Sequence, residues 1–320
     1  MNFSSAPVLD MDGFTHALIK SVSSLLGPEV EVTTSEQRKN NQVTYPCITL
    51  RHPERRLSPN IRVDGLFTSY KRGVMDIDAI TERIKAAYES SECETSELEY
   101  LYTDPGQLYD RIIFRLVNYE RNSEILDTYP HFRILDLAVI FCLTVSLPDD
   151  DSGDVKIDHR IASMLGLDAG QLLSHAVRNT PKLFPSSFKK IDELILDILR
   201  RNRFPESAFP LFADAGSFHT PMMVLTNSNG FYGACAILYP GVLEKIRETL
   251  GSDYYVLPSS VNEVIIVPYY DDGTDYLRDM VREVNQTTVP PEEILSDNLY
   301  IYPKDFDSSV IGPFMANARV

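Results

Sequence analysis

The chain has 320 residues, of which 43% are hydrophobic and 24% are charged, so it can bury a core and is long enough for two domains or one large domain. Its 46 acidic and 30 basic side chains give a net charge of −16, which disfavours binding to nucleic-acid phosphates and to anionic membranes. The acidic residues are scattered along the chain, which argues against an acidic protein that imitates DNA.

The ends of the sequence and its cysteines predict a cytoplasmic protein. The first residues, MNFSSAPVLDMDG, have neither the basic start nor the long apolar region of a signal peptide. The longest apolar run, 134–147, contains Asp136 and is too short to span a bilayer. Cysteines 47, 93, 142 and 235 form no C-x-x-C pair, the six histidines lack metal-site spacing, and no P-loop occurs. We therefore expect no metal and no cofactor.

Residues 1–100 are expected to form an N-terminal α+β module. Apolar side chains recur at helical spacing over 12–26, and Gly27-Pro28 ends that helix. Two alternating segments, 29–34 and 43–51, predict strands, and residues 38–41 between them predict a hairpin turn because Asn tolerates the left-handed conformation. A short strand, an amphipathic helix and a polar linker follow, at 61–63, 77–88 and 90–99.

Residues 101–210 are expected to form a central module of strands followed by helices. The apolar segments 111–119 and 135–147 predict strands, the second of them central in a sheet, with a short helix at 121–127 between them. A helix stays the alternative for 111–119, because short apolar runs fit both structures. Asp149 to Asp154 predict an exposed acidic turn, which lacks the spacing of a calcium loop. Three helices are predicted after it. The first, at 158–165, ends at the C-cap Gly166; the second, at 168–180, has Asp168 as its N-cap and ends before Pro181; the third spans 189–201.

Residues 211–320 are expected to form a C-terminal module of hairpins and helices. Segments 222–226 and 231–238 predict a hairpin across the Asn-Gly turn at 227–230. The further predictions are a helix at 240–250 capped by Gly251, strands at 254–257 and 263–269, a turn at 271–273, a helix at 275–285 and a strand at 299–302. The pattern predicts an α+β fold with mixed, mainly antiparallel sheets and flanking amphipathic helices.

The loop between the strands at 254–257 and 263–269 is the first candidate site. It brings together two hydroxyls, an amide and a carboxylate, from Ser259, Ser260, Asn262 and Glu263. No strand–Ser–helix elbow surrounds either serine, and no histidine is near in sequence. Two interpretations stay open, namely a turn whose hydroxyls satisfy backbone groups and an unrecognised hydrolase or transferase site.

A basic cluster is the second candidate site. Arg55 and Arg56 lie in RHPERR, which starts at Arg51, and Arg62 follows. These side chains can contact phosphate or a protein partner, but they do not alternate with aromatic residues as single-strand binders do. A solvated surface is the competing interpretation.

Six segments carry a family resemblance over roughly residues 30–302. They are RKNNQV at 38–43, RIIFRLVNYERN at 111–122, LDLAVIF at 135–141, NTPKLFP at 179–185, LTNSNGFYGACAILYPGVLEKI at 225–246 and LGSDYYVLPSSVNEVIIVP at 250–268. They resemble the clostridial domain-of-unknown-function family numbered five-six-eight-eight, and more distantly the YtpQ-like proteins. The resemblance implies a cytoplasmic α+β protein and no particular activity. Asn262 stands where His is frequent in that family, which argues against proton transfer at this position.

The sequence favours a non-enzymatic protein that binds another protein, because no catalytic constellation or cofactor motif is present. A hydrolase or transferase acting through residues 258–263 is one alternative. An acidic DNA mimic or anti-defence protein is the other. No membrane partner is expected, and the oligomeric state stays open.

Overall fold

The computed structural model describes residues 8–54, 58–90, 100–146, 152–194, 222–307, 310–312 and 314. The chain forms two compact units: unit 1 comprises residues 1–99 and 145–153, and unit 2 comprises residues 100–144 and 154–320. Helices and three mainly antiparallel sheets confirm the predicted α+β class. The division into modules 1–100, 101–210 and 211–320 stays a prediction.

Unit 1 begins with helix α1 (Met11–Leu26), close to the predicted bounds. The carboxylate of Asp10 caps it by accepting the backbone N–H of Gly13 at 2.8 Å, and Gly27 leaves the helix at φ 85°. Phe14, Leu18 and Val22 recur every four residues on one face and are buried. The helical period of the sequence therefore determines which face of α1 joins the core.

A three-stranded antiparallel sheet follows, in the order β1-β2-β3. Its strands are β1 (Glu31–Arg38), β2 (Thr44–Arg51) and β3 (Asn60–Arg62). A 3-10 turn, η1 (Asn40–Gln42), joins β1 to β2, and Asn41 has the left-handed φ of 58° that the hairpin prediction requires. The predicted hairpin and the short third strand are confirmed.

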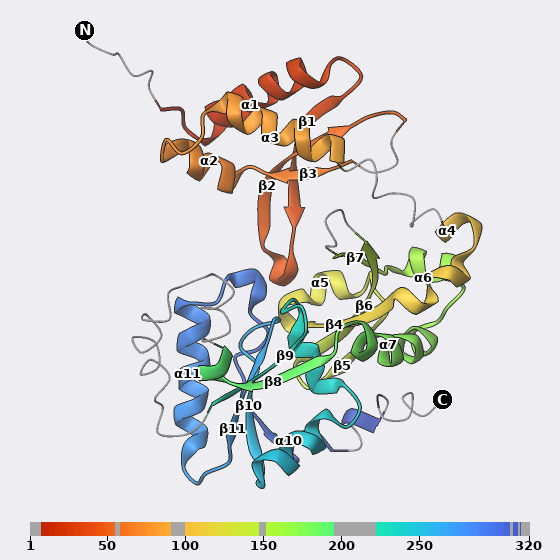
Figure 1. Cartoon of the computed structure of the whole chain (residues 1–320), viewed down its shortest axis with the longest axis vertical. Coiled ribbons are helices and arrows are strands. Elements are labelled where there is room, and N and C mark those ends of the chain that lie inside the picture. Colours follow the sequence, from red (N-terminus) through yellow and green to blue (C-terminus); the bar gives the residue numbers. More distant parts are fainter. Residues whose placement is uncertain are drawn as a thin grey trace. The chain divides into compact units, whose positions relative to one another are not determined.

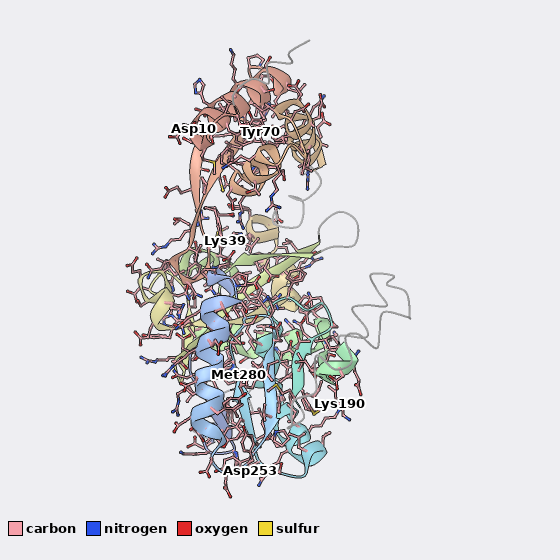
Figure 2. The ribbon with its side chains drawn as sticks, turned by 90° about the vertical axis from the view of Figure 1, so that its left-hand side faces the viewer. Asp10, Lys39, Tyr70, Lys190, Asp253 and Met280 are labelled. Carbon is pink, nitrogen blue, oxygen red and sulfur yellow. The ribbon has the colours of Figure 1, made fainter. Side chains whose placement is uncertain are left out.

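Helices α2 (Asp64–Lys71) and α3 (Ile77–Ser90) complete unit 1 and lie with α1 on one face of the sheet (Figure 1). The core between these layers contains ten buried residues: Phe14, Leu18, Val22, Val30, Ile48, Leu50, Val63, Ile80, Ile84 and Tyr88. The β1–β2 hairpin extends past the helices to Lys39, at the opposite end from Asp10 and Tyr70 (Figure 2).

The first sheet of unit 2 has the order β4-β6-β5, with β7 beside β6. Its strands are β4 (Ile112–Asn118), β5 (His131–Ile134), β6 (Leu137–Ser146) and β7 (Ser152–Lys156). Two short helical segments precede β4, namely α4 (Tyr100–Thr103) and η4 (Pro105–Arg111). Two more lie between β4 and β5, namely η5 (Glu120–Asn122) and α5 (Ser123–Leu126). The apolar strand β6 is therefore central, as predicted. The predicted exposed turn is corrected at Asp154, which lies on β7; residues 149–151 lie outside the described residues.

Helices α6 (His159–Leu165) and α7 (Ala169–Leu183) have the predicted caps. Gly166 is left-handed at φ 70°, and Asp168 forms a capping box with Gln171. The predicted end at Pro181 is wrong, because the helix continues to Leu183. Side chains just before the proline fix this turn to β4: Thr180 accepts the backbone N–H of Phe114, and Asn179 donates to the carbonyl of Ile112. These tertiary bonds outweigh the local penalty of proline.

The second sheet of unit 2 has the order β12-β10-β11-β9-β8. Its strands are β8 (Ser186–Lys190), β9 (Met223–Asn227), β10 (Tyr254–Leu257), β11 (Val264–Pro268) and β12 (Tyr300–Tyr302). Helix α11 (Gly273–Thr287) packs Leu277 and Val281 against one face. Helix α10 (Val242–Leu250) ends at left-handed Gly251, as predicted, and a 3-10 turn, η10 (Pro291–Glu293), precedes β12.

Two elements of this region differ from the predictions. Residues 231–238 are not a strand: the 3-10 helix η9 (Gly233–Leu238) is buried throughout, and β9 pairs with β8 and β11 instead. A Cβ on Gly233 would lie 2.5 Å from the carbonyl oxygen of Asn262, which shows how closely the two backbones approach. The helix predicted at 189–201 is wrong at its start, because Lys189 and Lys190 end β8; residues 195–201 lie outside the described residues.

A polar network joins the two sheets of unit 2. The carboxylate of Asp136, in the turn before β6, accepts hydrogen bonds from the hydroxyls of Ser296 and Tyr300 and from the side chain of Asn298. Asn118, at the end of β4, donates to the carbonyl of Leu295 at 2.8 Å. These bonds link segments more than 150 residues apart, so the sheets are held by directional contacts as well as by apolar packing.

Arg115 is a buried cation in the same unit. Its side chain on β4 is 3% exposed, and it donates to Asp154 from Nη2 at 2.8 Å and from Nε at 2.9 Å. The rings of Phe184 and Tyr232 lie 5.0 and 5.3 Å from the guanidinium. This ion pair with aromatic neighbours compensates the charge inside the fold.

Candidate functional site

Strand β1 forms one edge of the unit 1 sheet and exposes backbone groups there. Lys39 donates its backbone N–H to Val43, so the hydrogen-bonded pairs of this hairpin fall on the odd residues of β1. The N–H and C=O groups of Val32, Thr34 and Glu36 therefore point away from β2. Within the described ranges, none of these outward groups has a hydrogen-bond partner. Such an edge can pair with a further strand.

A groove of about 480 Å³ lies between β1 and α1. Ten residues line it: Met11, Asp12, Thr15, His16 and Ile19 from α1, Thr34, Ser35 and Glu36 from β1, and Pro46 and Cys47 from β2. We call this the β1 groove. Thr34 and Glu36 belong both to its lining and to the free edge, so a strand added to β1 would place side chains in the groove.

The sheet face opposite the helices of unit 1 is polar. The hydroxyl of Thr49 bonds with the hydroxyl of Ser35 at 2.7 Å and with the amide oxygen of Asn60 at 2.5 Å. The guanidinium of Arg62 lies 3.4 Å from the centre of the Tyr45 ring and also bonds with Asp64 at 2.7 Å. The Asp64 pKa is lowered, mainly by its hydrogen bond with Arg62. These cross-strand contacts stiffen the hairpin that carries the β1 edge.

The predicted loop at 258–263 lies in unit 2 and bonds mainly to residues 293–296. The carbonyls of Pro258 and Ser259 accept the N–H groups of Ser296 and Leu295, each at 2.9 Å, and Val261 donates to Glu293 at 2.8 Å. Ser260 is 3% exposed, and its hydroxyl accepts the N–H of Asn262 at 3.0 Å. A buried hydroxyl that already serves the turn is poorly placed to attack a substrate.

Asn262 and Glu263 continue this loop with different roles. The side-chain oxygen of Asn262 accepts the N–H of Tyr232 at 3.1 Å, and its carbonyl accepts the hydroxyl of Thr226 at 2.7 Å. Asn262 thus holds the left-handed residue Tyr232, whose φ is 50°. Burial raises the Glu263 pKa, the Ser260 hydroxyl lowers it, and the charge of Glu293 raises it further. The structure brings these four loop residues together as a turn.

The other predicted binding residues, Arg55 and Arg56, lie outside the described residues. Their neighbour Arg62 lies on the polar sheet face and bonds with Asp64. Arg51 ends β2 opposite Glu31.

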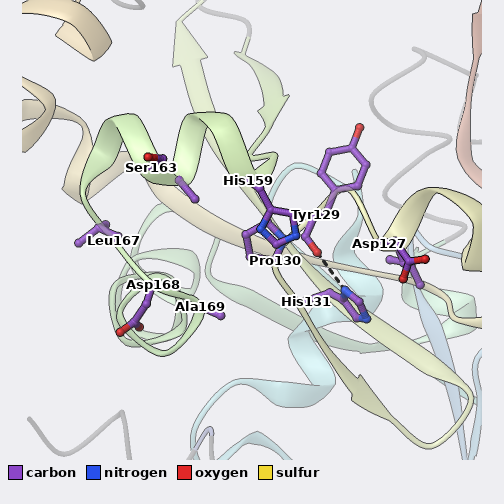
Figure 3. Close-up of a pocket in the computed structure, with 11 residues that line it drawn as sticks. Asp127, Tyr129, Pro130, His131, His159, Ser163, Leu167, Asp168 and Ala169 are labelled. Carbon is purple, nitrogen blue, oxygen red and sulfur yellow. Dashed lines mark hydrogen bonds between the residues drawn. The ribbon is translucent and has the colours of Figure 1, made fainter.

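A second groove, of about 640 Å³, lies in unit 2 (Figure 3). His131 and His159 lie between Asp127 on one side and Asp168 on the other. Nδ1 of His131 lies 2.9 Å from the carbonyl oxygen of Tyr129, which favours the tautomer that leaves Nε2 as an acceptor. Burial, together with the charge of Asp158, raises the Tyr129 pKa. Across the described part of the chain, no three His, Cys, Asp or Glu side chains are placed to hold a metal.

The residues of the β1 groove were not among the predicted site residues. The strand-period alternation of side chains over residues 29–34 predicted the strand, but such a pattern does not reveal which strand lies at the edge of a sheet. Asp12, Thr15 and His16 sit on one flank of the predicted α1, next to its apolar stripe. An amphipathic helix followed by a polar strand that the helix covers only in part is the pattern that would have pointed here.

The fold and the groove define an α+β protein with a free strand edge beside a helix. A protein-family model matches residues 11–304, and the chain belongs to this family, described as "Family of unknown function (DUF5688)". This confirms the family resemblance read from the sequence; the more distant YtpQ-like resemblance stays a prediction. No curated protein and no solved structure matches the chain.

Over the described ranges, no helix combines the length and the apolar character needed to cross a membrane.

Proposed function

We propose that this protein binds another protein non-enzymatically, by taking an extended segment of the partner as an additional strand on β1. The observation that carries the proposal is the row of outward-facing backbone groups at Val32, Thr34 and Glu36 beside the β1 groove. Strand addition uses such groups for affinity and an adjoining groove for side-chain selectivity.

The length and composition of β1 suit this use. It has eight residues, while the edge strands β3, β5, β7, β8 and β12 of the described sheets have three to five, and the seven-residue edge strand β4 is buried along its whole length. Five of its eight residues are exposed, and Val32 is its single aliphatic side chain. A polar edge of this length favours ordered pairing with a chosen partner over indiscriminate hydrophobic association.

The loop at 258–263 supports the enzyme alternative less well. Its buried Ser260 hydroxyl bonds within the loop, and Asn262 supports the neighbouring turn. Glu263 keeps a raised pKa, which is the property that favours a catalytic acid, and the charge of its neighbour Glu293 contributes to that shift. The hydrolase or transferase alternative therefore rests on these two carboxylates and not on the serines.

We place this binding activity in the cytoplasm. Among the described cysteines, Cys47, Cys142 and Cys235 are all free and buried, which suits a reducing compartment. Burial also raises the pKa of the Cys142 thiol to about 12, so it stays protonated and inert at neutral pH.

The test is a selection of random dodecapeptides displayed on phage against the full-length protein. We expect selected peptides to protect the backbone amides of Val32, Thr34 and Glu36 from hydrogen exchange, because those amides donate to the added strand. Thr34→Pro removes one of the outward N–H donors that the added strand needs, so it should abolish binding. The variant should still fold, because proline is tolerated on an edge strand where the N–H takes no part in the fold's own hydrogen bonds.

Lys190→Pro is the matched control. Ile191 donates its N–H to Met222, so Lys190 lies at a non-hydrogen-bonded position of β8 and its N–H also points outward. This variant should bind the selected peptides normally. Failure to select any peptide, or protection at amides away from β1, overturns the proposal, and the exchange measurement on the unmodified protein decides the matter even if Thr34→Pro misfolds.

A further inference from the structure

We infer that the β1 edge selects a basic segment, with a Lys or Arg side chain entering the β1 groove between Asp12 and Glu36. This inference rests on the proposed strand addition and specifies the chemistry of the partner.

Strand geometry determines which partner side chains enter the groove. Successive side chains of an added strand point to opposite faces of the sheet, so every second one lies beside Val32, Thr34 and Glu36. That is the face covered by α1, because Ile48 and Leu50, which pair with Thr34 and Val32, are both buried in the unit 1 core. The partner's alternate side chains therefore meet α1.

The charges of the groove favour a cation. Asp12 and Glu36 are its charged lining residues, one from the helix and one from the strand, and both are acidic. Neither takes part in an ion pair among the described residues. Arg38, the next residue of β1 on this face, lies toward the hairpin turn and is not part of the lining. A Lys or Arg ammonium or guanidinium would be the complement of this pair of carboxylates.

The remaining lining suits the stem of such a side chain. Met11, Ile19 and Pro46 supply apolar surface, while Thr15 and Thr34 are small. Lys and Arg bury their methylene stems along apolar surface and keep the charged end near water. The groove thus fits one long basic side chain flanked by short or aliphatic ones.

A second copy of this chain is a poorer occupant. Symmetric pairing over the length of β1 would bring Glu31 and Glu36 of both copies to one edge, four carboxylates against the two Arg38 side chains. A basic partner segment would compensate the carboxylates of β1, whereas a second copy of β1 would add carboxylates and increase the repulsion.

The experiment repeats the dodecapeptide selection on the full-length protein and on the double variant Asp12→Asn with Glu36→Gln. The matched control is Asp78→Asn with Glu82→Gln, which makes the same charge change at two exposed positions of α3. We expect Lys and Arg to be enriched at one of the alternating positions on the unmodified protein and on the control, and the enrichment to disappear on the groove variant. In a synthetic selected peptide, Lys→Gln should weaken binding roughly fivefold.

The outcomes separate the two levels of the proposal. Peptides that protect the β1 amides but carry no basic preference, or keep it on the groove variant, overturn this inference and leave strand addition intact. Absence of any β1-protecting peptide overturns strand addition itself. A dimer seen by sedimentation that Thr34→Pro dissociates would identify a second copy as the occupant and also overturn the inference.

Discussion

The two units of this protein differ in how the faces and edges of their sheets are covered. In unit 1 the described helices cover one face of the sheet and leave the eight-residue β1 as an edge. In unit 2 strands β4 and β10 are buried along their whole length, and the sheets are joined by side-chain hydrogen bonds.

This difference separates stability from recognition. Unit 2 contains buried side chains that form directional hydrogen bonds and a buried ion pair, and removing one partner leaves the other uncompensated, so its surroundings tolerate little change. Unit 1 packs an ordinary apolar core and leaves backbone groups unpaired at its edge, which is where a partner can bind. Substitutions in unit 2 should therefore affect folding, and substitutions at the edge of unit 1 should affect binding.

The largest expected effect is on unit 2, at the buried ion pair. Asp154→Asn leaves the Arg115 guanidinium, 3% exposed, without its anionic partner. We expect the free energy of unfolding to fall by about 3 kcal/mol, at the low end for a broken buried pair because the Asp154 side chain is itself 22% exposed. Urea unfolding, followed by hydrogen exchange of the β4 amides, measures the loss.

Asp279→Asn is the control for this prediction, because the side chain is 80% exposed and lies 3.9 Å from Arg282. It should change stability by less than about 0.5 kcal/mol. Equal effects of the two substitutions would contradict the distinction between buried and surface pairs in this fold.

Two glycine substitutions should have opposite effects in the two units. Gly233→Ala forces a methyl group to within 2.5 Å of the carbonyl oxygen of Asn262, and we expect it to destabilise unit 2 by about 1–3 kcal/mol. Gly65→Ala, in α2 with nothing within 4 Å, should stabilise unit 1 by about 0.5–1 kcal/mol. Thermal unfolding of both variants is the measurement, and a stabilised Gly233→Ala would show that the 226–233 turn can move.

The smallest expected effect concerns Glu263 and pH. Because the Glu263 pKa is raised in the folded state, the folded protein is more stable with this carboxyl group protonated than with it charged. This contribution to stability is complete below the unfolded pKa, near 4.5, and is lost as the pH rises through the folded pKa. Glu263→Gln should therefore raise the free energy of unfolding at pH 7 and should make that free energy depend less on pH above pH 4.5. Urea unfolding at several pH values measures both effects. A variant that is less stable at pH 7 would mean that the charged carboxylate is needed.

Local sequence patterns predicted the elements whose cause is local. The structure confirms the helices and the turn that local patterns predicted, from the N-cap Asp168, from Gly166 and Asn41, and from the apolar period of α1. Each of these signals acts within a few residues. The predictions were wrong where contacts with segments distant in sequence determine the local structure. SSFKK becomes β8 because it pairs with β9, and α7 continues through Pro181 because Thr180 and Asn179 bond to neighbouring segments.

The candidate site shows the same division. The strand-period alternation of residues 29–34 was enough to predict β1. The position of β1 at the sheet edge depends on the strand order, and the groove beside it depends on where α1 packs. Neither property is written in a short window of sequence. The loop at 258–263 was singled out because its residue types resemble a catalytic set, but in a turn the same hydroxyls and amides serve the backbone.

The exposed row of amides on β1 also has a consequence for the behaviour of the purified protein. A long unpaired strand is a template for amyloid-like stacking unless its sequence discourages it. In EVTTSEQR, gatekeeper charges at Glu31, Glu36 and Arg38 interrupt the strand, and no two aliphatic residues are adjacent. Concentrated salt screens those charges, so storage at low ionic strength should keep the preparation free of fibrils.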